Sequence, residues 1–305
     1  MDTTVILNQM IIIFILMMLG CILAKTGVIT EEGSRLLSDL ILTVLNPAII
    51  LSSAMDQNRA GGMKDILFGV VLALLLYAVL LVLGNVIPIL LRCRRDEKRI
   101  YNLMAVFGNI GFIGIPLVAA VLGKGAVIFV TVFNLPYNVL IYTYGVYLMT
   151  KGTEKQKLNW KGFFSPGTVA SILGLLIFAF QIPMPEVVSS TADYLGNAIT
   201  PLSMLVIGVS LSELSIKDIF NNFRLYLFCI LRMLVVPLAV AICLKPFVQN
   251  EILYQVSVLL VAMPVGSMPV ILAKQYDTDV NQATKGVVLS TILSIITVPI
   301  VAILL

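Results

Sequence analysis

The sequence predicts an all-α membrane protein, with ten transmembrane helices in two inverted repeats of five and with broken, crossing fourth and ninth helices. Of its 305 residues, 59% are hydrophobic and 12% are charged, whereas a soluble domain carries about 25% charged residues. Two of the apolar segments are interrupted by Gly and Pro at matching places in the two halves of the chain. These observations predict the fold class, and the elements follow in chain order.

Ten apolar segments are long enough to cross a bilayer, which takes about 20 residues of helix. The first lacks a basic region and a cleavage site, so we expect a retained span and not a signal peptide. Only short connections separate the segments. The expected spans are residues 4–24, 34–55, 65–91, 100–122, 125–150, 165–182, 192–212, 219–244, 252–275 and 282–305.

The positive charges predict the orientation. Cytoplasmic loops carry an excess of Lys and Arg. An outer amino terminus places on the inner side Lys25, Arg35, Arg92, Arg94, Arg95, Lys98, Arg99, Lys151, Lys155, Lys157, Lys161, Lys217, Arg224, Lys274 and Lys285, and on the outer side only Arg59, Lys64, Lys124 and Lys245. We therefore expect a multi-pass protein of the plasma membrane with both termini extracytoplasmic.

The ninth span contains Pro264, Gly266, Ser267 and Pro269 near its middle. Proline removes a helical hydrogen bond and crowds the preceding turn, so this span is expected to break into two halves. Unpaired backbone groups survive at membrane depth only when they are buried in protein or line a watered cavity. We therefore expect Gly266 and Ser267 to line a binding site.

The fourth span carries a similar interruption, with Gly108, Asn109, Gly111 and Pro116. Pro116 and Pro269 lie 153 residues apart. Such a pair of interrupted spans points to the substrate site of a secondary transporter. We expect Pro116, Pro264 and Pro269 to hold the crossover open, and Gly111 to lie at the site.

A short motif supports the repeat. Met63–Ile66 reads M-K-D-I, and Ile216–Ile219 reads I-K-D-I at the same spacing of 153 residues. An odd number of helices in each copy would place the copies in opposite orientations. The predicted units are residues 1–150, a short basic cytoplasmic linker at 151–162, and residues 163–305.

Asn109 is the first candidate for substrate contact, because its amide can both donate and accept beside an unwound backbone. The alternative is that it satisfies only the backbone groups freed by the break. Arg232 interrupts the eighth span. It serves either as a counter-charge for an anionic substrate or as a structural clamp on backbone carbonyls.

The chain has no His, and its acidic residues are expected in loops and at span ends, Asp39 among them. Proton or sodium coupling through a carboxylate in the membrane core is therefore not supported. No cofactor or metal site is expected. Partial positive charge at the half-helix N-termini favours an anion at the crossover.

Asn134 and Asn138 of the fifth span lie four residues apart, so they share one helical face. We expect that face to point to the crossover, since amides facing lipid would be unsatisfied. Tyr142, Tyr144 and Tyr147 fit an interfacial aromatic belt. The tenth span is polar too, at Thr284, Ser290, Thr291, Ser294 and Thr297, although Ser and Thr can bond within their own helix.

The run Pro264–Tyr276, P-V-G-S-M-P-V-I-L-A-K-Q-Y, resembles the ninth helix of the auxin efflux carrier family. Asn109, seven positions before Pro116, resembles the fourth helix of that family, and Arg232 with Pro237 resembles its R-x4-P element. The resemblance covers the whole chain in span order.

This resemblance implies a fold similar to sodium/proton antiporters and bile-acid transporters. It also implies an elevator mechanism, in which helices one, two, six and seven form a scaffold and the others form a moving transport unit. Asn138 falls where plant members place a site-lining Gln. Gly108 and Ile50 depart from the plant pattern, which argues against auxin as the substrate.

We expect a secondary active transporter of small organic anions, mono- or dicarboxylates such as malate or malonate. The alternatives are an exporter of auxin-like aromatic carboxylates, a channel, or a sensor that binds without transport. A channel would need a continuous polar stripe, and an intramembrane enzyme would need a base, nucleophile or metal set that the spans lack. The expected partners are the anion, the lipid bilayer and a possible second copy of the chain, without nucleic acid.

Overall fold

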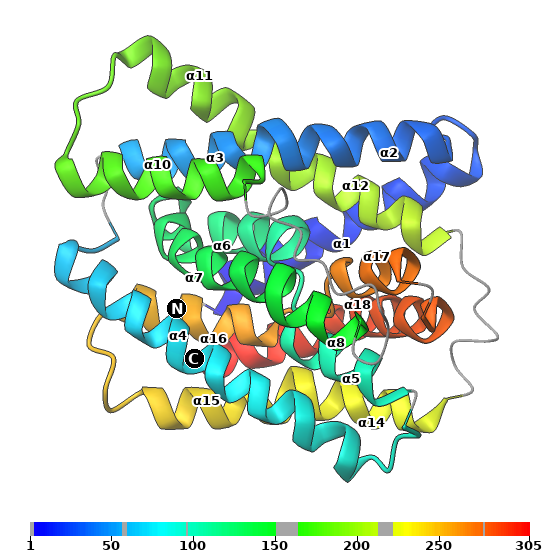
Figure 1. Ribbon diagram of the computed structural model, residues 1–305. Coiled ribbons are helices and arrows are strands. Elements are labelled where there is room, and N and C mark those ends of the chain that lie inside the picture. The colour runs from blue at the N-terminus through cyan, green and yellow to red at the C-terminus, as the bar shows by residue number, and fades with distance from the viewer. Residues whose placement is uncertain (1–2, 57–59, 96, 151–163, 213–221, 277) are drawn as a thin grey trace.

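The structure is a computed structural model and describes residues 3–56, 60–95, 97–150, 164–212, 222–276 and 278–305. Within these ranges the regular structure is helical, apart from one isolated bridge between Gly108 and Val265. The longer helices run roughly from left to right across Figure 1. The predicted all-helical class is confirmed.

The described residues up to Thr150 form eight helices, several of them joined by short turns. The helices are α1 (Thr3–Lys25), α2 (Glu31–Leu40), α3 (Asn46–Met55), α4 (Met63–Leu90), α5 (Glu97–Val106), α6 (Ile115–Leu122), α7 (Val127–Leu140) and α8 (Val146–Thr150). The turns are the π turns η1 (Ile41–Leu45), η2 (Ile110–Gly114) and η4 (Ile141–Gly145), and the 3-10 turn η3 (Lys124–Ala126).

The second half continues with α10 (Pro166–Phe180), α11 (Glu186–Asn197), α12 (Ile199–Ser212), α14 (Phe223–Ile230), η5 (Leu231–Val235), α15 (Val236–Leu244), α16 (Glu251–Ala262), α17 (Met268–Gln275) and α18 (Val280–Leu304). Each expected span contains helix. Among the described residues, six helical segments are long and apolar enough to cross a membrane, by length and composition. The count of ten crossings stays a prediction.

Three of the π turns precede a proline by two residues. Pro47 follows η1, Pro116 follows η2 and Pro237 follows η5. Proline has no N–H to donate and its ring crowds the carbonyl four residues earlier. A π turn widens the helix there, so the chain continues across the proline without a full break.

The family resemblance predicts a scaffold and a transport unit, and the helices are named here by that predicted division. The scaffold group comprises α1–α3 and α10–α12: α1 packs along α12, and α10 and α11 pack against α3. The crossover group comprises α4–α8 and α14–α18, where α4 packs along α5 and α14 contacts α18. In Figure 1, α2, α3, α10, α11 and α12 lie in the upper part, and α4, α5, α14 and α15 lie in the lower part.

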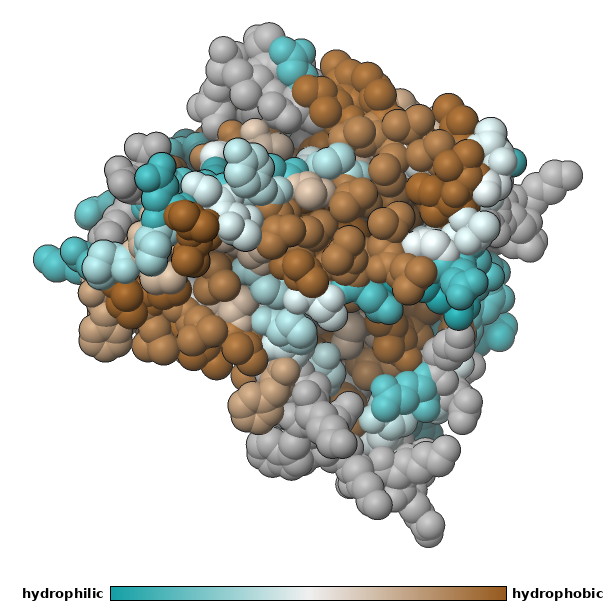
Figure 2. Space-filling model, turned by 90° about the horizontal axis from the view of Figure 1, so that it is seen from above, coloured by the Kyte–Doolittle hydropathy of each residue, from teal (hydrophilic) through white to brown (hydrophobic). Residues whose placement is uncertain are grey.

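The outer surface is strongly apolar. Hydrophobic side chains, drawn in brown, cover much of the face seen in Figure 2. On α4, Leu67 is 61% exposed, Leu74 57% and Val82 62%. Apolar surface on this scale marks a protein whose outer face meets lipid or a partner, as the composition predicts.

Two predicted features lie outside the described residues. The basic linker at 151–162 is one, and the second copy of the repeated motif, Ile216–Ile219, is the other. The division of the chain into two inverted repeats therefore stays a prediction.

Candidate functional site

The two predicted interruptions meet in the structure. Helix α5 ends at Val106 and the helix resumes at Ile110, while α16 ends at Ala262 and α17 begins at Met268. The unwound segments pair in antiparallel fashion about Gly108 and Val265. The Asn109 N–H donates to the Pro264 carbonyl at 2.8 Å, and the Gly266 N–H donates to the Phe107 carbonyl at 3.0 Å. Each break therefore satisfies backbone groups of the other, as burial at membrane depth requires.

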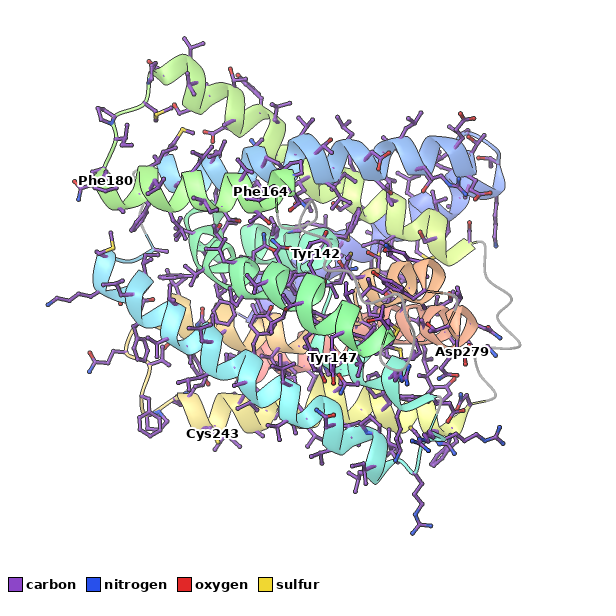
Figure 3. All side chains as sticks on the ribbon, in the orientation of Figure 1. Tyr142, Tyr147, Phe164, Phe180, Cys243 and Asp279 are labelled. Atoms are coloured by element: carbon purple, nitrogen blue, oxygen red, sulfur yellow. The ribbon has the colours of Figure 1, made fainter. Side chains whose placement is uncertain are left out.

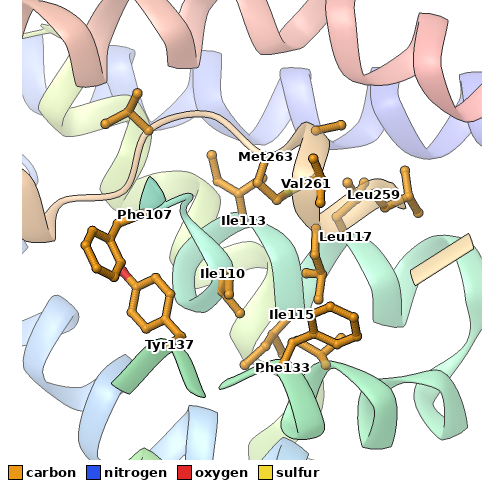
Figure 4. Close-up of a cluster of buried hydrophobic side chains, with 14 of the residues drawn as sticks. Phe107, Ile110, Ile113, Ile115, Leu117, Phe133, Tyr137, Leu259, Val261 and Met263 are labelled. Atoms are coloured by element: carbon orange, nitrogen blue, oxygen red, sulfur yellow. The ribbon is translucent and has the colours of Figure 1, made fainter. Parts of the chain in front are cut away.

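The close approach of the two segments requires glycine at position 266. A Cβ atom there would lie 2.9 Å from the Gly108 carbonyl oxygen, a distance that a methyl group cannot occupy without moving the backbone. Apolar side chains seal the surroundings. Phe107 meets the ring of Tyr137 edge-on, with ring centroids 5.4 Å apart, and Met263 lies at the other break (Figure 4).

The prolines have different places. Pro264 lies in the unwound segment and supplies an acceptor carbonyl. Pro269 follows at the start of α17, a position where its missing N–H costs nothing. Pro116, expected at the crossover itself, lies instead at the start of α6. The break precedes it by a turn, because the π turn η2 accommodates this proline.

Arg232 ties the two broken helices together. Its side chain is 2% exposed. The Nε donates to the Ala105 carbonyl at 2.6 Å, and an Nη donates to the Val261 carbonyl. Both carbonyls belong to the last turns of α5 and α16, where the breaks remove the usual N–H partners. These contacts match the structural clamp of the two alternatives for Arg232.

A third helix also contributes to the break. Ser290 of α18 accepts a hydrogen bond from the Val265 N–H at 3.0 Å and donates to the Val287 carbonyl at 2.9 Å. The Val265 N–H would otherwise be buried without a partner at the interruption. The weak polar signal of the tenth span thus includes one residue that supports the crossover.

A cavity of about 330 Å³ lies beside the breaks. It is enclosed by α2, η1, η2, α12, α17 and α18, so it lies between the scaffold group and the crossover group. Its described lining comprises Ser38, Asp39, Leu42, Asn109, Phe112, Val206, Ile207, Ser210, Ser267, Ile271, Val287, Val288 and Thr291. This mostly apolar lining with a few polar groups is typical of a small-molecule site.

Asn109 and Ser267 line this cavity from the two breaks. Asn109 is the N-cap of η2, and its Oδ1 accepts from the Phe112 N–H at 3.1 Å. Ser267 is the N-cap residue of α17, but its side chain makes no capping hydrogen bond. The amide NH2 of Asn109 and the hydroxyl of Ser267 are donors beside two helix N-termini, whose partial charge is positive.

Gly111 and Gly266 lie near the cavity but not in its described lining. Gly266 is buried at the crossover. A Cβ atom on Gly111 would lie 3.3 Å from the Nδ2 of Asn46, so this glycine permits close packing of η2 against the start of α3. Both glycines have a packing role in the structure, and their predicted contact with substrate stays a prediction.

Asn134 and Asn138 share a face, and that face meets α10. Asn134 Nδ2 donates to Ser171 Oγ at 3.3 Å, and Asn138 Nδ2 donates to Thr168 Oγ1 at 2.9 Å. The structure does not bring either residue into the described lining of the cavity. The expected orientation toward the crossover is therefore wrong here, because hydroxyl groups of α10 accept from both side-chain NH2 groups. Tyr147, on the same segment (Figure 3), is 50% exposed, as a belt residue should be.

Four polar residues of the cavity were not predicted as site residues: Ser38, Asp39, Ser210 and Thr291. Asp39, expected at a span end, lies within the helical segment Glu31–Met55. It is the one charged side chain in the described lining. The expectation that the acids lie in loops and at span ends gave Asp39 no part in the site, and its place in the cavity lining is the difference. Asp39 falls only two turns into its helix, which made it resemble a terminal residue in sequence.

Comparison with known sequences places this chain in a family. The sequence model described as membrane transport protein matches residues 5–302. The chain belongs to this family, that of the auxin efflux carriers. The predicted resemblance is confirmed, and the chain is a membrane protein of a transporter family.

Curated relatives match most of the chain. An uncharacterized transporter of Methanothermobacter thermautotrophicus is 25% identical over 298 residues, which is 96% of each chain. An uncharacterized transporter of Methanocaldococcus jannaschii is 25% identical over 301 residues, also 96% of each. A proposed malonate transporter of Rhizobium meliloti is 25% identical over 218 residues, covering 66% of this chain and 65% of its own.

Proposed function

We propose that this protein is a secondary active transporter of small organic anions, mono- or dicarboxylates such as malonate or malate. One observation carries the proposal: the cavity between the two helix groups is lined by the N-cap residues of both broken helices, Asn109 and Ser267. The relative from Rhizobium meliloti that is named for malonate supports this substrate class.

The charge distribution at the breaks favours an anion. The helix N-termini at Ile110 and Met268 present partial positive charge to the cavity. The C-termini of α5 and α16 carry the opposite partial charge, and they face Arg232. Arg232 therefore acts on the anion indirectly, by offsetting the negative ends and holding the positive ends in place.

Asp39 limits how the anion lies. Its carboxylate lines the same cavity, and it repels a second negative charge. We expect a bound carboxylate to contact Asn109 and Ser267 and to lie away from Asp39.

Alternating access would follow from movement of the crossover group along the scaffold group, as in an elevator. Ser210 and Ile271 line the cavity near the ends of α12 and α17, close to the connections that follow Ser212 and Gln275. The positive-inside bias assigns these connections to the cytoplasm. We therefore interpret this conformation as open to the cytoplasm.

The opposite side is held closed by a contact between the groups. Lys124 Nζ lies 2.7 Å from Asp193 Oδ1, and the Ser52 hydroxyl also donates to Asp193. Lys124 belongs to the crossover group, whereas Asp193 and Ser52 belong to the scaffold group. Sliding of one group along the other would separate these residues.

Counterflow of labelled malonate in proteoliposomes tests the function. Asn109→Ala should reduce exchange at least tenfold, because the substituted side chain has no donor for the carboxylate. Asn197→Ala is the matched control, since Asn197 is exposed at the end of α11. A thermal-shift screen with small carboxylates identifies the substrate beforehand, because a ligand of the folded state raises apparent stability.

Two outcomes would contradict the proposal. If Asn109→Ala exchanges malonate as fast as Asn197→Ala, the site is elsewhere. If no carboxylate in the panel is exchanged by the wild-type protein, the assigned transport activity is wrong.

A further inference from the structure

A second cavity, of about 170 Å³, lies between α4, α5 and α8. Its lining includes the polar residues Asn85, Lys98, Arg99 and Asn102 and the apolar residues Ile89 and Leu148. It shares no described lining residue with the cavity at the helix breaks. The proposed transport function makes no use of it.

The two cations of this cavity are available for a ligand. The neighbouring acid, Glu97, already accepts from Arg224 at 2.8 Å and from the Arg94 backbone N–H at 2.9 Å. Across the described ranges, neither Lys98 nor Arg99 forms an ion pair with a carboxylate. The site therefore carries net positive charge that an anion would neutralise.

A buried amide adds a directed donor. Asn102 is 3% exposed, and its Oδ1 accepts a hydrogen bond from the Tyr144 hydroxyl at 3.0 Å. With Oδ1 as the acceptor of this bond, the Nδ2 group of the amide is a donor. An amide N–H with a lysine and an arginine makes a donor set suited to phosphate oxygens.

The cavity borders a lipid-facing surface. Val82, Val86 and Ile89 of α4 are exposed by 62%, 47% and 62%, and Ile89 also lines the cavity. Basic pockets at the cytoplasmic boundary of a membrane suit anionic lipid head groups. A lipid whose phosphate is held by Lys98 and Arg99 would place its acyl chains along this apolar row of α4. Free phosphate has no acyl chain to make that contact.

We propose that this cavity binds the phosphate group of an anionic phospholipid, with its acyl chains on the exposed face of α4. The lipid would join the end of α4 to the start of α5, the first half of the broken helix. This inference is independent of the transported substrate.

Thermal shift of the purified protein in detergent tests the proposal. Short-chain phosphatidylglycerol is compared with phosphatidylcholine of the same chain length and with inorganic phosphate at equal concentration. Phosphatidylglycerol should raise the melting temperature more than phosphatidylcholine, and inorganic phosphate alone should not raise it. The wild-type comparison depends on no variant.

A paired substitution locates the site. Lys98→Gln with Arg99→Gln should weaken phosphatidylglycerol binding by tenfold or more. Each basic residue near an anionic lipid surface raises the binding affinity by about fivefold, and this variant removes two. Arg94→Gln with Arg95→Gln is the matched control, because these exposed residues lie next to the cavity but do not line it.

Three outcomes would overturn the proposal. Equal shifts with phosphatidylcholine would show that the head-group charge is not recognised. Equal shifts with inorganic phosphate would identify a site for the free anion and not for a lipid. Equal weakening by both double substitutions would show that general surface charge, and not this cavity, attracts the lipid.

Discussion

At the residue scale, the site depends on a few side chains with opposite tasks. Asn109 and Ser267 present donors at the positive ends of two half-helices, while Arg232 holds their negative ends. A cation buried in an apolar, membrane-spanning segment is costly unless its N–H groups donate hydrogen bonds to nearby acceptors. Arg232 uses them on backbone carbonyls of both broken helices, which explains its place in an otherwise apolar span.

Replacing Arg232 separates its two interpretations. Arg232→Gln should lower thermal stability strongly, because it removes two charge-assisted hydrogen bonds of about 1.5–3 kcal/mol each. Arg224→Gln is the control, since a partly exposed ion pair contributes only about 0–1 kcal/mol. The melting temperatures of both variants, measured in detergent beside malonate exchange, decide the point. A loss of exchange in Arg232→Gln at unchanged stability would favour the counter-charge role instead.

The same scale shows what sequence can and cannot predict. Asn109 and Ser267 were predictable because they adjoin Pro and Gly in apolar spans. Asp39 and Ser210 were not, because their place in the cavity depends on how α2 and α12 pack against each other and how α12 packs against η2. Asn134 and Asn138 share the predicted face, but partners on α10 decided its direction.

At the element scale, the broken helices are held by their mutual pairing. The two unwound segments exchange backbone hydrogen bonds, and Ser290 of α18 satisfies a further N–H. The breaks were predictable from local sequence, since proline and glycine act on their own helix. The exact position of the break was not predictable. The π turn η2 accommodates Pro116 within the helix, so the interruption falls at residues 107–109.

Gly266→Ala tests the close approach of the two segments. The added methyl group would lie 2.9 Å from the Gly108 carbonyl oxygen, so the segments must separate and the two N-termini must shift. We expect malonate exchange to fall at least tenfold. The control is Gly62→Ala, where an added methyl group meets nothing within 4 Å. Unchanged exchange in Gly266→Ala would show that the crossover tolerates separation.

At the scale of the whole molecule, the cavity lies between helices of the predicted scaffold group and of the predicted crossover group, and Lys124 of the second pairs with Asp193 of the first. The span order and the two interrupted helices were predictable from the sequence. The grouping was implied only by family resemblance, because packing between distant spans leaves no local pattern in a uniformly apolar chain.

Cross-linking tests movement between the groups. In a variant without its native cysteines, Lys124→Cys with Asp193→Cys, joined by a short bifunctional maleimide, should stop malonate exchange because the groups can no longer slide. Glu97→Cys with Arg224→Cys is the control, since this pair joins α5 and α14 within the crossover group. Mass spectrometry measures the cross-linked fraction, and exchange is measured in the same sample. Undiminished exchange through the fully linked first pair would contradict sliding.

The central claim is that an organic anion binds where the two broken helices present their N-termini. Crystals grown with bromomalonate test it directly, because anomalous scattering locates the bromine atom. The account predicts a peak in the cavity beside Asn109 and Ser267. A peak at Arg232, or anywhere outside that cavity, would contradict it.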